Sequence, residues 1–179
     1  MHKKDFLWLF AFPVYMLLGT IRHEAAHALV IWLQGAKIEE FVILPGFLDG
    51  HFYFGYVSWT GENVTWAATA APYFLDLLTF GVFFAICVFV CFKHRWIWLN
   101  LVIIGLISPL LNSGYQYLKP ALGMVGDIPA LLAEVPAVYI HVYMITTILL
   151  YLAGLWYIFF RSRRSQTAAD GEERRMNSF

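Results

Sequence analysis

The sequence predicts an all-α membrane protein of about four transmembrane helices, with a small β-hairpin loop after the first helix. Of its 179 residues, 60% are hydrophobic and 13% are charged, whereas a soluble domain carries about 25% charged residues. Formal net charge is zero, so nothing points to a nucleic-acid partner. The chain length suits one helical domain over residues 1–160, followed by a polar tail at 161–179 that we expect to be disordered.

Four apolar stretches reach the length of about 20 residues that crosses a bilayer. They cover residues 6–34, 66–92, 96–118 and 128–160. The last span begins either near residue 128 or nearer Pro136, because Pro129 and Pro136 both interrupt a regular helix. Basic residues cluster before the first span, between the second and third, and after the last, at Lys3-Lys4, Lys93–Arg95 and Arg161–Arg164. Since basic residues mark the cytosolic side of a membrane, we expect both termini of this multi-pass protein in the cytosol.

The segment 36–61 does not have the composition of a membrane helix. Lys37–Leu44 and His51–Trp59 are rich in β-branched and aromatic residues, which favours two strands. Turn signals lie between them at Pro45-Gly46 and Asp49-Gly50. We therefore predict a hairpin whose exposed edge is able to take up an extended peptide as an added strand. The alternative is an aromatic cap at the membrane interface.

The stretch His23-Glu24-Ala25-Ala26-His27 is an H-E-x-x-H motif inside the first span. Residues four apart share one helix face, so both imidazoles can bind one metal ion. The intervening glutamate is then placed to act as base on a water at the metal. Polar groups are costly in a bilayer, which favours a functional site over a polar helix face satisfied by neighbouring helices. We predict a zinc site with His23 and His27 as ligands and Glu24 as the catalytic base.

A catalytic zinc usually has three protein ligands, so one ligand must come from another part of the chain. We favour Asp127, because the glycines and prolines around it allow this segment to dip into the bundle. The alternative reading of Asp127 is a helix N-cap followed by Pro129 in the first turn. Asp76 lies at a similar depth in the second span and is the main rival, as a ligand or as a partner of an imidazole. A protonated buried acid is the third reading of Asp76. Two weaker rivals lie near the last span: Glu134 and His141.

Asn112 lies in the half of the third span that is further from the expected cytosolic side, and it is the candidate substrate-binding residue. Its amide is able to hydrogen-bond a substrate carbonyl or an oxyanion. A hydrogen bond between two helices explains a membrane asparagine equally well.

These residues resemble the site-2 protease family of intramembrane zinc metalloproteases. The resemblance covers most of residues 6–135 and is carried by four stretches: His23–Leu29, Gly35–Ile38, Ala70–Pro72 and Gly126-Asp127. The first two are similar to the family's motif helix and to the turn into its hairpin loop. The third is similar to an Ala-Gly-Pro segment, with alanine in place of glycine, and the fourth to a later aspartate ligand. The resemblance implies His23, His27 and Asp127 as zinc ligands and Glu24 as the base.

We therefore expect a membrane-embedded zinc metalloprotease that binds one Zn²⁺ per chain and hydrolyses peptide bonds of membrane-associated substrates. Its expected partners are a membrane protein or peptide and the lipid bilayer. Two alternatives remain: a zinc hydrolase of a lipid amide or ester, and a non-enzymatic membrane scaffold. Substitution of Glu24 separates the scaffold from the two enzymes, because a scaffold needs no base.

Overall fold

The computed structural model describes the backbone of residues 5–48, 50–90, 92 and 94–176. It describes the side chains of residues 11–47, 50–90, 92, 94 and 96–160. The basic side chains on which the expected orientation rests, those of Lys3, Lys4, Lys93, Arg95 and the arginines after Phe160, lie outside this set. The cytosolic placement of both termini therefore stays a prediction.

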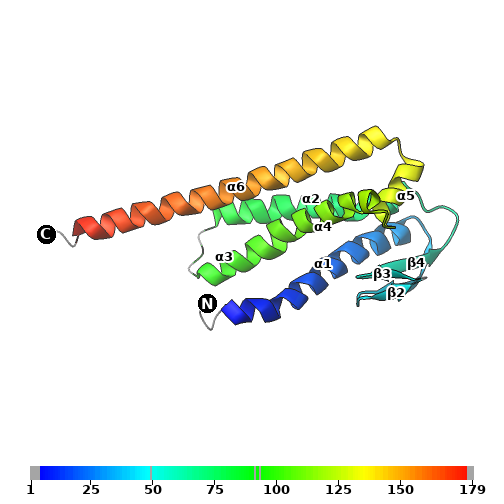
Figure 1. The fold of residues 1–179 in the computed structure, drawn as a ribbon, viewed down its shortest axis with the longest axis horizontal. Helices are drawn as coiled ribbons and strands as arrows, with labels where there is room; N and C mark the ends of the chain where they lie inside the picture. Colours follow the sequence, from blue (N-terminus) through cyan, green and yellow to red (C-terminus); the bar gives the residue numbers. More distant parts are fainter. Residues whose placement is uncertain (1–4, 49, 91, 93, 177–179) are drawn as a thin grey trace.

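The chain is mainly helical, and its helices run roughly side by side (Figure 1). The helical elements in order are α1 (Asp5–Leu33), α2 (Trp66–Phe89), α3 (Arg95–Val102), the π-helical η1 (Ile103–Ile107), α4 (Ser108–Leu118), the 3₁₀ turn η2 (Pro120–Leu122), α5 (Asp127–Glu134) and α6 (Ala137–Met176). The short helix α5 and the strands lie at the end of the bundle opposite to the start of α1 (Figure 1).

Three helical segments of the described residues are long and apolar enough to cross a membrane: Trp66–Phe89, Trp96–Leu118 and Ala137–Phe160. Large apolar side chains on these segments point outward, and Leu78, Leu149 and Trp156 are between 60% and 67% exposed. So much outward apolar surface needs a lipid environment. The structure thus has the character of a membrane protein, while the crossing by α1, the fourth expected span, stays a prediction.

The last predicted span is divided into two helices. α5 ends at Glu134 and α6 begins at Ala137, with Val135 in an extended conformation (φ −118°, ψ 138°). A residue that precedes proline is disfavoured in the α region, and Pro136 follows. The helix that is long and apolar enough to cross a membrane therefore starts at 137 rather than 128. The backbone of α6 continues to Met176, and the expected disorder of the tail stays a prediction.

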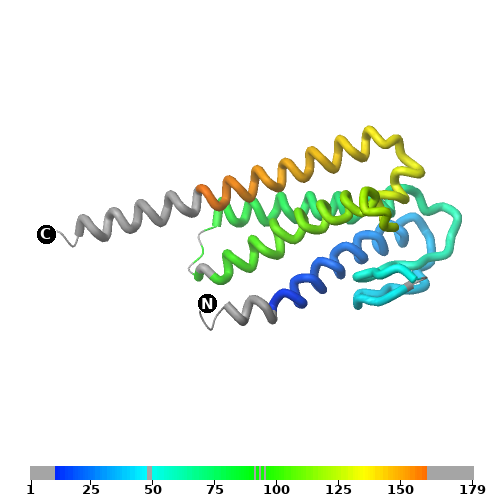
Figure 2. The backbone as a smooth tube through the Cα atoms, in the orientation of Figure 1, coloured from blue at the N-terminus to red at the C-terminus, as the bar shows by residue number. Residues whose placement is uncertain are grey.

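The predicted hairpin is present and is interrupted in the middle. β1 (Lys37–Val42) pairs antiparallel with β4 (Tyr56–Thr60), and β2 (Gly46–Leu48) pairs with β3 (His51–Tyr53). The expected second strand is thus split at Phe54-Gly55. The paired strands fold back against the second half of α1, the half that carries the motif (Figure 2).

Two contacts place α2 and α5 beside the motif. The side chain of Gln34, just after α1, donates to Thr65 Oγ1 at 2.8 Å and accepts from the Thr65 amide at 3.1 Å. This exchange joins the end of α1 to the start of α2. Ile128 of α5 is 1% exposed and packs with Tyr73 of α2 and Met144 of α6. The neighbouring Asp127 is thereby held at the inner side of the bundle.

Candidate metal centre

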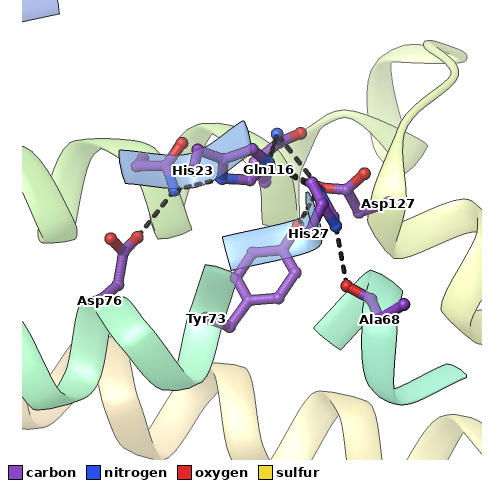
Figure 3. Close-up of polar contacts among 8 residues, drawn as sticks. His23, His27, Ala68, Tyr73, Asp76, Gln116 and Asp127 are labelled. Atoms are coloured by element: carbon purple, nitrogen blue, oxygen red, sulfur yellow. Dashed lines mark hydrogen bonds and ion pairs between the residues drawn. The ribbon is translucent and has the colours of Figure 1, made fainter. Parts of the chain in front are cut away.

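His23 and His27 of α1 meet Asp127, the first residue of α5 (Figure 3). Asp127 Oδ2 lies 2.9 Å from His23 Nε2 and 3.5 Å from His27 Nε2, and the two Nε2 atoms lie 3.3 Å apart. The three donor atoms all fall within 4.8 Å of one another. The N-cap residue of α5 is Gly126, and Asp127 is the first residue of the helix rather than its cap; its carboxylate lies against the two imidazoles.

The donor atoms fit a tetrahedral metal. Two ligands bound about 2.05 Å from a tetrahedral zinc lie roughly 3.3 Å apart, which matches the three separations. Two histidines and a carboxylate are also a donor set found in catalytic zinc sites. His27 Nδ1 lies 2.8 Å from the carbonyl oxygen of Ala68, which accepts a hydrogen bond from the Nδ1–H group and leaves the lone pair of Nε2 free to bind a metal.

The other imidazole is held through Asn112. The amide nitrogen of Asn112 lies 3.1 Å from His23 Nδ1 and donates to Asp76 Oδ2 at 2.7 Å. Asn112 therefore links the ring of His23 to α2. The amide also lines the cavity at the site, and its expected role in substrate binding stays a prediction.

Asp76 belongs to an ion pair rather than to the group of metal donors. Arg22 Nε donates to Asp76 Oδ1 at 2.9 Å, and Nη2 forms an ion pair with the same oxygen at 2.8 Å. Asp76 is 1% exposed, so this pairing supplies the charge that a buried carboxylate requires. The structure thus brings Asp127 to the imidazoles and places Asp76 one contact further away, behind Asn112.

The two weaker rivals also lie apart from the donor group. His141 is exposed and its Nδ1 lies 2.9 Å from the hydroxyl of Tyr117. Glu134 is the last residue of α5 and is exposed.

Sequence reasoning missed Gln116 and Tyr73, which complete the surroundings of Asp127. Gln116 Nε2 lies 3.5 Å from both His23 Nε2 and Asp127 Oδ2, and Tyr73 donates to Asp127 Oδ2 at 3.2 Å. Gln116 Oε1 is buried and has no hydrogen-bond partner in the described structure. An unsatisfied acceptor beside three donor atoms is the kind of group that a bound cation or water would satisfy. The signal in the sequence was the helical spacing of Asn112, Gln116 and Lys119 on one face of the third span.

Arg22 was also missed, although it precedes the motif directly. In addition to its pairing with Asp76, Arg22 donates a hydrogen bond from Nη1 to the carbonyl oxygen of Ile104 at 3.3 Å. In η1 the amide of Ser108 bonds the carbonyl of Ile103, five residues back, so the next amide in this pattern would serve Ile104. That residue is Pro109, which has no N–H. Arg22 therefore satisfies a carbonyl that the helix cannot.

Glu24 lies within the same cavity as the metal donors. It is 6% exposed, and the cavity of about 730 Å³ extends from it between α1, β3–β4 and α4. The residues that line the cavity include those of the site and several apolar groups, among them Phe12, Met16, Ile107, Leu111 and Val57. A cavity of this size with a few polar groups at one place is typical of a binding site for an apolar ligand.

The charged groups near the donor atoms shift one another's pKa values. Burial by itself would raise the pKa of Asp127, but the hydrogen bonds and charges of His23 and His27 outweigh it and hold that pKa well below its usual range. Burial lowers the pKa of Lys119, and the carboxylates of Asp127 and Glu24 oppose this effect. The site thus favours an ionised carboxylate at Asp127, the form that binds metal.

Comparison with protein-family models, curated proteins and solved structures gives no match to this chain. What the site does must be argued from its own geometry.

We predict that Asp127→Ala lowers zinc affinity more than Asp76→Ala does. Asp127 supplies a donor atom, whereas Asp76 acts through Asn112, and loss of such an indirect partner typically costs about 10–100-fold in metal affinity. Competition titrations against a chromophoric chelator measure both affinities on purified protein. Asp76→Asn, which keeps the size of the side chain, serves as the second variant where Asp76→Ala impairs folding. The reverse ranking would transfer the third ligand to α2.

Proposed function

We propose that the chain is a membrane-embedded zinc metalloprotease that hydrolyses peptide bonds of membrane-associated substrates. The observation that carries the proposal is the meeting of Asp127 with the H-E-x-x-H motif, from 104 residues away in sequence. A chance match to H-E-x-x-H would not be expected to have a third donor atom at the distance that a tetrahedral metal requires.

His23, His27 and Asp127 would hold the zinc, which when bound would lower the pKa of a water and polarise the carbonyl that is attacked. Glu24 accepts the proton of the attacking water and then delivers it to the nitrogen that leaves, as the new C–O bond replaces the C–N bond. Ala68 and Asn112 fix the orientation of the two imidazoles. The buried position of Glu24 keeps bulk water away from the transferred proton.

A peptide is favoured over a lipid as substrate because a strand borders the cavity. Tyr56 and Val57 of β4 line it, and within the residues that the structure describes β4 is paired with β1 alone. The other edge of β4 has no strand partner among these residues, and a peptide must be extended before a carbonyl of its backbone is accessible. A lipid amide or ester needs no such edge.

The junction of β3 and β4 packs directly on the proposed base. A Cβ atom at Gly55 would lie 2.6 Å from Thr20 Cγ2, 2.7 Å from the Val42 oxygen and 3.1 Å from Glu24 Cγ. Only glycine permits this approach, so the hairpin and Glu24 are positioned together.

We predict that Glu24→Gln abolishes peptide hydrolysis while zinc content and fold are retained. Glutamine preserves size and hydrogen bonding but cannot accept the proton, and loss of a general base costs about 10²–10⁴ in rate. Cleavage of quenched fluorescent apolar peptides in detergent micelles is the assay, with a fluorescent lipid amide measured in parallel. Wild-type turnover in the variant would rule out this role of Glu24, and turnover of the lipid alone would favour the lipid hydrolase.

We also predict that Gly55→Ala lowers the cleavage rate more than it lowers zinc affinity. The added methyl would overlap Thr20 and the Val42 carbonyl and press on Glu24, and a misplacement of about 1 Å can cost 10²-fold in rate. Gly46→Ala is the matched control, because a Cβ at Gly46 meets no atom within 4 Å. Equal rates for the two variants would show that the contact between hairpin and base does not matter.

A further inference from the structure

Lys119 brings an ammonium group to the cavity that holds the proposed metal centre. It follows the last residue of α4 and is half-buried. It lines the cavity together with Glu24 and Asp127, and it is the only lysine or arginine among the described residues that do so. The proposed hydrolysis gives this residue no task.

The ammonium is directed towards the segment that carries Asp127. A Cβ atom at Gly126 would lie 3.0 Å from Lys119 Cδ and 3.2 Å from Nζ, so the absence of a side chain at Gly126 makes room for the lysine. Nζ also lies 5.1 Å from the centre of the Tyr115 ring. A lysine next to a membrane span usually extends to the interface, where lipid headgroups surround its charge. Lys119 instead turns inward.

Among the described side chains, Lys119 makes no ion pair; those present join Arg22 to Asp76 and the two histidines to Asp127. The charged groups of the loaded site would be a divalent cation, Asp127, Glu24 and Lys119. Two positive charges of the metal and one of the lysine, less two carboxylates, leave one positive charge in excess. Transfer of a proton from a water to Glu24 moves charge but does not change this sum.

An excess charge in a partly buried apolar cavity is costly unless a counter-charge arrives. A neutral peptide leaves this sum unchanged, because the negative charge that forms on its carbonyl oxygen during the attack is matched by the proton that Glu24 has taken up. A carboxylate on the substrate supplies a counter-charge, and a charge-assisted hydrogen bond to an ammonium is one of the stronger contacts available.

We propose, on the basis of the proposed function, that Lys119 binds a carboxylate of the substrate beside the metal centre. The carboxylate is either the free C-terminus of a peptide or an acidic side chain close to the bond that is cut. The preferred substrate is therefore an apolar peptide with a negative charge at that place.

Binding rather than cleavage tests this subsite. The probe is a fluorescent N-acyl apolar tripeptide in three forms: with a free C-terminal carboxylate, with a C-terminal amide, and with a C-terminal amide after an added glutamate. Affinities are measured for the zinc-loaded Glu24→Gln protein in neutral detergent at fixed ionic strength. We expect at least one carboxylate form to bind about ten- to a hundredfold more tightly than the uncharged amide. The form that does so identifies the source of the carboxylate.

Combining Glu24→Gln with Lys119→Met should reduce this preference clearly without abolishing it, because the zinc charge that the neutral glutamine no longer offsets still favours a carboxylate. Lys119→Arg should keep the preference, because arginine retains the charge. Lys37→Met, which removes an exposed lysine of β1 that does not line the cavity, is the matched control and should keep it as well. An unchanged preference in Lys119→Met would overturn the inference. So would an equal loss of affinity for all three probes, which would indicate a structural role.

The two proposals fail in different ways. A protein that shows the Lys119-dependent preference but cleaves no peptide would keep the carboxylate subsite and lose the protease. A protein that cleaves peptides at the same rate in Lys119→Met, with no preference for charge in either form, would keep the protease and lose the subsite.

Discussion

The carboxylate of Asp127 is the group on which the arrangement of this protein depends. A charge placed among apolar helices must be compensated, and Asp127 is compensated by two imidazoles, a tyrosine hydroxyl and a glutamine amide from three other helices. Each of those helices is therefore constrained in rotation and depth. The same set of contacts brings three donor atoms within reach of one cation, so the requirement for charge balance and the capacity to bind a metal have one structural origin.

A second charged contact, between Arg22 and the buried Asp76, supports the first. Arg22 joins α1 to Asp76 of α2 and to the free carbonyl of Ile104 in the π-helical segment. Since Arg22 directly precedes His23, this ion pair also fixes the depth of the motif in the bundle. Asp76 in turn holds Asn112 against His23. Removal of one partner of a buried pair leaves an uncompensated charge, which costs about 3–5 kcal/mol in other proteins.

Much of this could be predicted from the sequence, because local patterns determine it. The apolar segments, the turn residues of the hairpin and the i, i+4 histidines each follow from neighbouring residues, and Asp127 was favoured because glycine and proline surround it. The pairing of Arg22 with Asp76, the position of Gln116 and the inward turn of Lys119 depend on how the helices are rotated against one another. No short stretch of sequence encodes that rotation. The break at Pro136 was visible, but its place became definite only through the packing of α5 on α2 and α6.

X-ray absorption at the zinc edge of purified, folded protein tests the central claim most directly, because it reports the ligands of the metal themselves. The structure predicts nitrogen and oxygen neighbours at about 2.0–2.2 Å, with the outer-shell scattering of two imidazoles and no sulfur. His23→Ala should reduce that imidazole contribution to a single ring. A folded protein that binds no zinc, or a spectrum with sulfur at about 2.3 Å or without paired imidazoles, would contradict the assignment of His23, His27 and Asp127 as a metal centre.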